Sequence, residues 1–442
     1  MARPRRAGVN RERAGGRGPD DRLNATGGGD AVTDPAPFDV SDAVRSAAGR
    51  AASRGLCAEC FGRLFGRLGH GLTNPERTER IAAATGLAPG PPKGCPVCGG
   101  LFDGLDPWVE RAVRAADGFE WHRFTCGSRW EPERLAFEEA LWTEVGTEWG
   151  ESARSAFNRE LGKRIEARTG AVGGTERPDL VFLADLAVGR VERTVLPLYV
   201  RGRYRKLDRT LPQTRWPCRR CRGRGCDACG GSGKTYAESV EELIAAPCLR
   251  ATGAEGSRFH GMGREDIDAR MLGRGRPFVL ELLRPRRRTV DLVAISGSLE
   301  RSAAGRVEVL DVVPTDAAEV VRVKEASPEK SYRVGVVGAA TVAKVNEALS
   351  LALARAIAQR TPTRVAHRRA DRVRTRRIVA ARLVDASEGR FTLELRTEAG
   401  TYVKEWVEGD GGRTEPNLAS LVGAALKVEF LDVMEIHDPE GG

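Results

Sequence analysis

The chain has 442 residues, of which 41% are apolar and 30% charged, and its formal net charge is +10. This length suggests two to four domains. The positive balance favours a polyanionic partner, nucleic acid before a membrane, and the predominance of arginine favours RNA; a merely solvated basic surface is the alternative. We find neither a secretory signal nor an apolar run long enough to cross a bilayer, so we expect a cytoplasmic protein.

The first half of the chain divides by composition. Residues 1–38 lack hydrophobic periodicity and predict a disordered basic tail. Residues 39–130 contain two helical stretches, "VSDAVRSAAGRAA" and "NPERTERIAAATG", and two cysteine pairs. Residues 131–205 predict a compact α/β unit with two amphipathic helices and a hairpin near Gly189. Residues 206–237 then form a cysteine-rich linker.

Residues 238–442 show a mixed pattern. We expect a long helix at 341–359 and strands at 278–283, 307–313, 319–324, 331–337, 376–384, 390–396 and 426–435. Because most of these strands follow one another through short turns, the pattern predicts an α+β domain with a largely antiparallel sheet.

Eight of the ten cysteines form C-x-x-C pairs. Cys57 and Cys60 can join Cys95 and Cys98 in a four-thiolate structural zinc site. A denser cluster, "CRRCRGRGCDACGGSGK", contains Cys218, Cys221, Cys226 and Cys229, and its spacing resembles the zinc repeats of DnaJ-type chaperones. It predicts one more zinc ion, with a loop of oxidisable thiols as the alternative. We expect one or two structural ions and no catalytic one.

Three weak signals follow one another in the second half. Asp266 lies in "GRED", a turn flanked by Arg264 and Arg270, and a neighbouring arginine favours an ionised carboxylate. Alone, this aspartate is either structural or a nucleophile or base. Tyr332 lies on a valine-rich strand, and Lys404 lies in "GTYVKEW" at a strand-to-helix junction.

The order of these motifs resembles that of the pseudouridine synthases. "GRED" is similar to their first motif, "SYRVGVV" to the second and "GTYVK" to the third. More narrowly, "GREDIDARMLGRGRPFVLEL", "KLDRTLPQTRW" and "GTYVKEWVEGDGGRTEPN" resemble the Pus-ten family of tRNA enzymes over about residues 50–437. The basic tail departs from the family pattern, and we associate the second cysteine cluster with archaeal members.

The resemblance implies a C-terminal pseudouridine synthase domain at 238–442, a zinc-knuckle module at 39–130 and a THUMP-like RNA-binding domain at 131–205. It implies isomerisation of uridine to pseudouridine at T-loop positions 54 and 55 of tRNA, although the residues themselves leave open whether one or both are modified. The enzyme would need no cofactor for catalysis and no obligatory protein partner, and it would hold the T arm and acceptor stem.

The resemblance also implies roles for individual residues. Asp266 would be the essential carboxylate, which attacks the sugar or abstracts a proton from it. Lys404 would pair with Asp266, and Tyr332 would stack under the flipped base. Tyr402, Arg264 and Arg270 would contribute to substrate binding.

Two other functions fit parts of the sequence. A non-catalytic zinc-containing tRNA-binding or RNA chaperone protein would explain the charge and the DnaJ-like cluster, but not the order of Asp266, Tyr332 and Lys404. Another THUMP-bearing enzyme, a methyltransferase or thiolation enzyme, would need a nucleotide or methyl-donor site with a Gly-rich loop, and we find none after residue 238.

Overall fold

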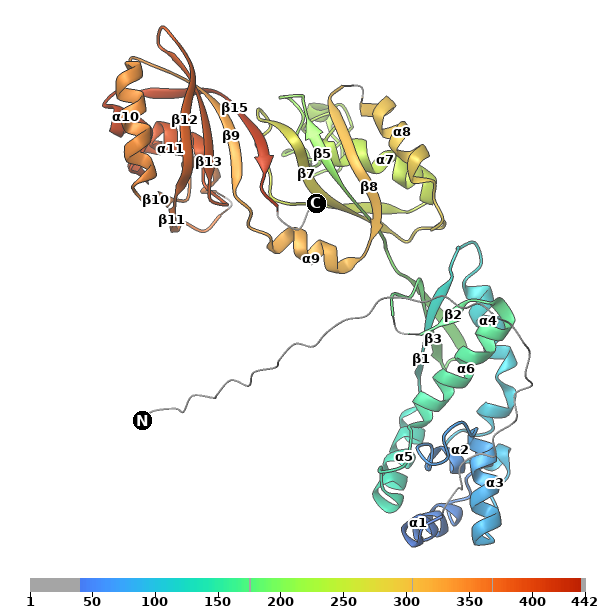
Figure 1. Cartoon of the computed structure of the whole chain (residues 1–442). Helices are drawn as coiled ribbons and strands as arrows, with labels where there is room; N and C mark the ends of the chain where they lie inside the picture. The colour runs from blue at the N-terminus through green and yellow to red at the C-terminus, as the bar shows by residue number, and fades with distance from the viewer. Residues whose placement is uncertain (1–39, 175, 304, 368, 439–442) are drawn as a thin grey trace, which may run out of the picture.

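The computed structural model describes residues 40–174, 176–303, 305–367 and 369–438. The tail expected at residues 1–38 lies outside these ranges. Figure 1 shows an N-terminal lobe, coloured blue to green, that projects from a larger C-terminal domain coloured yellow-green to red. None of the helices in the described ranges combines the length and the apolar character that a bilayer crossing requires.

The N-terminal lobe combines helices with a four-stranded sheet of order β2-β1-β3-β4. Its strands are β1 Arg123–Arg129, β2 Val172–Gly173, β3 Leu180–Asp185 and β4 Arg190–Val195. Its helices are α1 Asp42–Ala52, α2 Ala58–Arg63, α3 Asn74–Thr85, α4 Asp106–Ala115, α5 Pro132–Val145 and α6 Ala153–Thr169. One hydrophobic core runs from Val40 to Val195. The two modules expected at 39–130 and 131–205 therefore share a core, with β1 inside the common sheet.

An eight-stranded sheet forms the centre of the C-terminal domain, in the order β12-β13-β9-β15-β7-β5-β8, with β6 paired to β7. Every pairing is antiparallel except that of β15 with β7, so the expectation of a largely antiparallel sheet is confirmed. The strands are β5 Leu198–Lys206, β6 Gly256–Gly261, β7 Arg270–Leu283, β8 Val307–Thr315, β9 Lys330–Gly338, β12 Ile378–Ser387, β13 Arg390–Thr397 and β15 Leu426–Ile436.

Strand β5 differs from its sequence assignment. The boundary expected at residue 205 places this segment in the THUMP-like unit, but its hydrogen bonds join β7 and β8 of the C-terminal sheet. Sequence patterning identifies a strand but not its partners, and partners decide the domain to which a strand belongs.

The remaining elements of this domain cover the sheet or extend it. They are α7 Val240–Thr252, α8 Leu292–Ala303, α9 Ala317–Glu325, α10 Val342–Leu353, α11 Val403–Glu408 and α12 Leu418–Val422, with a small sheet of β11 Val373–Arg376, β10 Ile357–Arg360 and β14 Thr414–Glu415. Helices α10 and α11 lie beside β9, β12 and β13, and α7 and α8 lie beside β5 and β8 (Figure 1). The side of the sheet that contains β5, β7 and β8 has one hydrophobic core, and the side that contains β9, β12 and β13 has another. Tyr332 packs against both cores.

In this domain one expected strand is wrong and one expected helix is shorter than predicted. Residues 319–324 form part of helix α9 and not a strand, because Asp316 caps the helix through the backbone N–H of Ala318 at 3.0 Å and Val320 and Val323 share one packed face. The helix expected at 341–359 ends at Leu353, and residues 357–360 form β10, which is paired on both edges.

The segment between β7 and α8 ties the two lobes together. The Arg288 guanidinium contacts the Asp179 carboxylate at 3.1 Å, and its backbone N–H donates to Glu120 at 2.6 Å. Glu120 in turn donates its own N–H to the carbonyl of Arg286 at 2.8 Å. Because the Arg288 side chain is only 9% exposed, this junction is a packed contact and not a flexible tether.

Candidate active site

A pocket of about 320 Å³ opens where the two halves of the C-terminal sheet meet. Five segments that are distant in sequence supply its walls: the loop between β6 and β7 with the start of β7, strand β9, the arginine-rich segment around β11, the start of α11, and strand β15. Its lining includes Arg264, Glu265, Asp266, Arg276, Lys330, Tyr332, Arg364, Arg369, Arg374, Arg376, Tyr402 and Lys404. The three motif residues Asp266, Tyr332 and Lys404 thus lie in one cavity.

Asp266 lies between two cations. Its Oδ1 accepts from Nη1 of Arg364 at 2.9 Å, and its Oδ2 lies 3.6 Å from Nζ of Lys404. Arg364 also contacts Glu405 at 2.6 Å. Burial alone would lower the pKa of Arg364, but the hydrogen bond to Glu405 and the charge of Asp266 raise it. Both carboxyl oxygens of Asp266 therefore face a cation.

Lys404 has a closer acidic partner than expected. Its Nζ contacts the Asp268 carboxylate at 2.7 Å, nearer than Asp266. Burial would raise the pKa of Asp268, but the hydrogen bond and charge of Lys404 lower it. The nearer cation of Asp266 is Arg364, a residue that the sequence motifs do not predict for the site.

The loop of residues 262–269, here called the Asp266 loop, is fixed by a buried ion pair. Glu265 and Arg276 meet at 2.8 Å with side chains 0% and 1% exposed. The Tyr204 hydroxyl donates to Glu265 at 2.9 Å, and Gln213 donates to that hydroxyl at 2.8 Å. Arg276 also donates to the carbonyl of Met262 at 2.6 Å. The residue directly before Asp266 therefore anchors the loop.

A buried lysine holds the other side of the Asp266 loop. Lys206 Nζ donates to the carbonyls of Asp266 at 3.1 Å and Ile267 at 2.7 Å. Burial lowers the pKa of Lys206 to about 8, against the charges of nearby carboxylates. The stretch "RGRYRKLDR" is strongly basic, yet its Arg203, Tyr204 and Lys206 are buried beneath the active site.

Two tyrosines border the pocket. Burial raises the pKa of Tyr332 to about 12, with the positive charge of Arg276 acting in the opposite direction, so its hydroxyl is protonated at neutral pH. The backbone of Tyr402 is held on both sides by the amide of Gln359, at 2.9 Å each. Its hydroxyl accepts from Arg369 at 3.1 Å.

The two arginines expected to flank Asp266 have different surroundings. Arg264 lines the pocket, with its guanidinium 5.2 Å from the centre of the Trp216 ring. Arg270 is exposed at the start of β7 and is not among the lining residues, while its backbone N–H donates to Asp432 at 3.2 Å.

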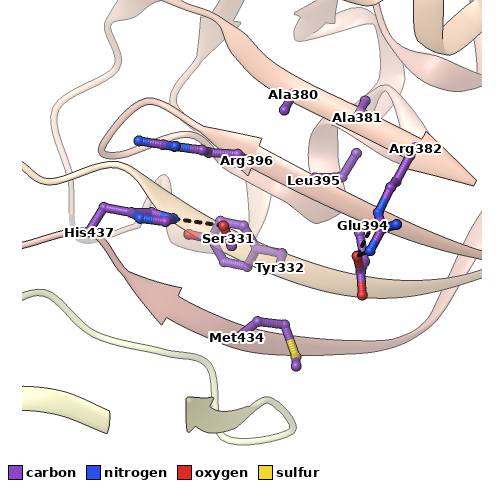
Figure 2. Close-up of a pocket in the computed structure, with 10 residues that line it drawn as sticks. All are labelled: Ser331, Tyr332, Ala380, Ala381, Arg382, Glu394, Leu395, Arg396, Met434 and His437. Carbon is purple, nitrogen blue, oxygen red and sulfur yellow. Dashed lines mark hydrogen bonds and ion pairs between the residues drawn. The ribbon is translucent and has the colours of Figure 1, made fainter. Parts of the chain in front are cut away.

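A second pocket, of about 340 Å³, lies on β9, β12, β13 and β15 (Figure 2). Ser331 and His437 meet there at 2.8 Å. Its carboxylate, Glu394, already accepts from Arg333 at 2.7 Å and from Arg382 at 2.9 Å. Of the three motif residues only Tyr332 lines this pocket, whereas Asp266, Tyr332 and Lys404 all line the first, so the pocket with Asp266 is the better candidate.

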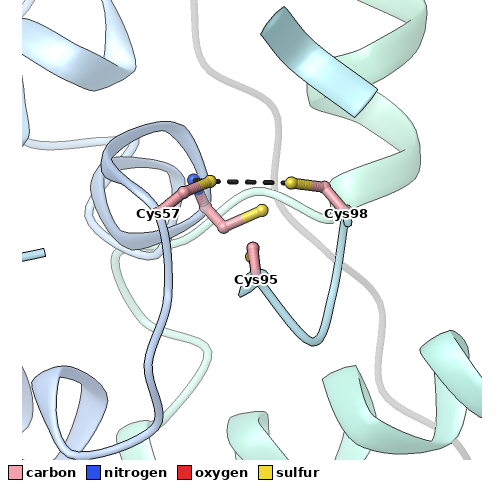
Figure 3. Close-up of side chains that lie close together, drawn as sticks. Cys57, Cys95 and Cys98 are labelled. Carbon is pink, nitrogen blue, oxygen red and sulfur yellow. Dashed lines mark hydrogen bonds between the residues drawn. The ribbon is translucent and has the colours of Figure 1, made fainter. Parts of the chain in front are cut away.

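The first cysteine tetrad lies inside the N-terminal core. Cys57, Cys60, Cys95 and Cys98 are buried, and their sulfur atoms lie within 4.8 Å of one another. The Cys57 and Cys98 sulfurs lie 3.5 Å apart, and Figure 3 shows them facing each other. Four thiolates around zinc, at about 2.3 Å each, lie about 3.8 Å apart, so this tetrad could hold such an ion.

The second tetrad also gathers its sulfurs within 4.8 Å, despite the short spacing of its pairs. Backbone N–H groups of Gly225 and Gly233 donate to the sulfurs of Cys221 and Cys229 at 3.2 Å. Gly225 has φ +90°, and a Cβ there would lie 2.6 Å from the carbonyl oxygen of Gly231. Glycine is needed for this hairpin to close, and the donor set could hold a metal ion.

Comparison with known proteins gives matches along most of the chain. The family model described as "Pus10, C-terminal" matches residues 199–437, and the "Pus10 THUMP domain, archaeal" model matches residues 108–185. The crystal structure of a Cbf5–Nop10–Gar1 complex aligns with 53% of this chain and 48% of that chain at 14% identity, with a TM-score of 0.29, a likeness too weak to support an argument.

Curated relatives agree with the family models. The tRNA pseudouridine synthase Pus10 of Methanothrix thermoacetophila is 41% identical over 86% of this chain and 91% of its own length. That of Methanopyrus kandleri is 42% identical over 87% and 96%, and that of Archaeoglobus fulgidus 40% identical over 86% and 99%. This likeness favours an isomerase over the non-catalytic RNA-binding function. The chain therefore belongs to the Pus10 family of tRNA pseudouridine synthases and carries an archaeal-type THUMP domain followed by the Pus10 C-terminal domain.

Proposed function

We propose that this enzyme converts uridine to pseudouridine at positions 54 and 55 of the tRNA T loop, with Asp266 as the essential carboxylate. The observation that carries this proposal is the pocket in which Asp266, between Arg364 and Lys404, lies with Tyr332 and Tyr402. A uridine in a folded loop must leave the stack to reach such a cavity.

Each side chain has a role that suits its surroundings. Asp266 either attacks the sugar or removes a proton from it, and its carboxyl oxygens lie between the cations of Arg364 and Lys404. The Tyr332 ring would stack under the flipped base and assist removal of the C5 proton late in the reaction, with its hydroxyl taking that proton while passing its own to solvent. Tyr402 and Arg264 would hold the nucleotide at the rim, whereas Arg270, away from the lining, would contact only RNA outside the pocket.

The arginines around the pocket suit the phosphates of the bound RNA. Arg369, Arg374 and Arg376 line the same cavity on the segment that contains β11. Phosphate contacts of this kind position RNA, and the pocket selects the base. We further propose that the N-terminal lobe holds the T arm and acceptor stem by shape, in the cytoplasm and without an obligatory protein partner.

The decisive experiment uses an unmodified tRNA transcript and no added cofactor. We expect carbodiimide-dependent primer-extension stops at positions 54 and 55 after incubation with the wild-type protein. A transcript with cytidine at position 55 is the control, and it should retain only the stop at position 54. Stops confined to another arm of the tRNA would contradict the proposed target while leaving the family reaction intact.

We also propose that each cysteine tetrad binds one structural zinc ion. Cys60 is fully buried in the N-terminal core, so Cys60→Ser should remove one zinc ion and lower the free energy of unfolding by more than about 3 kcal/mol, because the metal stabilises the folded lobe. Elemental analysis and thermal unfolding measure the two effects.

Cys126→Ser is the matched control, since Cys126 is half-buried and belongs to neither tetrad. It should leave the zinc content at two ions per chain. Equal zinc content in the Cys60→Ser protein and the wild type would show that the first tetrad is not a metal site.

A further inference from the structure

The hairpin of the second tetrad has a narrow neck that begins at Trp216. The Trp216 carbonyl accepts from the Thr235 N–H at 2.9 Å, and the Cys218 N–H donates to the Gly233 carbonyl at 2.8 Å. Pro217 and Lys234 form a β-bridge between these two contacts. Trp216 is therefore separated from Cys218, the first cysteine of the tetrad, by one residue. The segment that follows the last cysteine holds it through the Thr235 hydrogen bond.

The same segment contacts the Asp266 loop at two adjacent points. The Arg264 guanidinium lies 5.2 Å from the centre of the Trp216 ring, and the Tyr236 ring packs edge-on against Trp216 at 5.6 Å. Three residues earlier, the Gln213 amide donates to the Gly263 carbonyl at 3.0 Å. Gly263 and Arg264 begin the "GRED" motif, so both contacts fall two or three residues before Asp266.

Whether the neck of this hairpin is ordered depends on whether the four cysteines are held together. Five of the 17 residues in 218–234 are glycine, and glycine loses the most conformational freedom when a chain becomes ordered. Of the four cysteines, Cys226 and Cys229 are only half-buried, so the hairpin has little core of its own. A metal ion bound by the four thiolates supplies the ordering free energy that apolar burial does not.

We propose that Trp216 is a positioning residue through which metal in the second tetrad holds Arg264 at the rim of the active-site pocket. The proposal rests on the proposed role of Asp266 and on metal binding by this tetrad. A guanidinium held over the Trp216 ring, which itself packs against Tyr236, loses little freedom when it meets the target nucleotide. Misplacing it would weaken the orientation of the flipped uridine, which lowers kcat more than the affinity for tRNA.

The test compares three variants of the full-length protein: Trp216→Ala, Trp216→Phe and the double variant Cys226→Ser/Cys229→Ser. Hydrogen exchange at residues 263–268 reports on the loop without requiring catalysis. We expect faster exchange there in Trp216→Ala and in the cysteine double variant, and wild-type exchange in Trp216→Phe, because phenylalanine keeps an aromatic face. The double variant should contain one metal ion fewer.

Kinetics on an unmodified tRNA separate positioning from RNA binding. We expect kcat to fall about tenfold in Trp216→Ala and in the double variant, with KM within about twofold of wild type, and near-complete recovery in Trp216→Phe. In an Arg264→Gln background, Trp216→Ala should have little further effect, because both changes remove the same contact.

Three outcomes would overturn the proposal. A raised KM with unchanged kcat would make the hairpin a direct RNA contact. Unchanged exchange at 263–268 in the double variant would show that the metal does not reach the loop. Additive effects of Trp216→Ala and Arg264→Gln would show that the contact between Trp216 and Arg264 does not couple the tetrad to the pocket. Failure of the wild type to modify positions 54 and 55 would instead refute the proposed target, while the exchange results would still decide the coupling.

Discussion

Replacing Asp266 with asparagine should abolish pseudouridine formation, with kcat lower by at least about ten-thousand-fold, because the amide can act neither as nucleophile nor as base. The fold should persist: Arg364 retains its 2.6 Å contact with Glu405, and Lys404 retains its 2.7 Å contact with Asp268. Binding of tRNA should stay within about threefold of wild type, since removing a negative charge does not weaken attraction to phosphate. Single-turnover modification and filter binding measure the two quantities.

Asp268→Asn is the matched control for this experiment. It makes the same change of charge two residues away on the same loop, at a side chain that is 68% exposed and outside the pocket lining. It should retain most of the activity. Equal inactivity of the two variants would mean that the charge of the loop matters and not a specific carboxylate, and an active Asp266→Asn protein would refute the assignment of Asp266.

The second large effect should come from the buried ion pair beneath the active site. Arg276→Met should lower the free energy of unfolding of the C-terminal domain by about 3–5 kcal/mol, because it leaves the Glu265 charge buried without its partner. Activity should fall with it, since Glu265 directly precedes Asp266. Urea denaturation followed by circular dichroism measures the loss.

Two further variants distinguish loss of the ion pair from loss of packing. The double variant Arg276→Met/Glu265→Gln should recover most of the stability, because no unpaired charge remains. Arg274→Met, at a side chain that is 56% exposed and paired with Glu435 at 3.0 Å, should cost less than about 1 kcal/mol. If the double variant were no more stable than Arg276→Met alone, packing and not the unpaired charge would explain the loss.

Several features of the site could be predicted because their signals are local. A C-x-x-C turn presents two thiolates wherever it folds, and both tetrads indeed gather their four sulfurs. The turn before a strand, the tyrosine on a strand and the lysine at the start of a helix are likewise properties of short segments. The structure has them at Asp266, Tyr332 on β9 and Lys404 on α11.

Other features depend on partners that are far apart in the sequence. Arg364 is separated from Asp266 by 98 positions, and nothing near either residue marks the pair. Tyr204 and Lys206 look like part of a basic surface because their neighbours are arginines, yet the pairing of β5 with β7 and β8 buries them. The valines of helix α9 also fit a strand pattern, but the cap at Asp316 and the packing of one face stabilise the helix.

The sequence by itself determined the class of the protein: its cysteine tetrads, its antiparallel sheet and the order of the three motif residues, all carried by residue type and short-range spacing. The tertiary structure decided which cation lies nearest to Asp266, which charges are buried beneath it and to which sheet β5 belongs. Those outcomes depend on which surfaces meet across the fold, because burial and ion pairing are set by contact in space and not by neighbourhood along the chain.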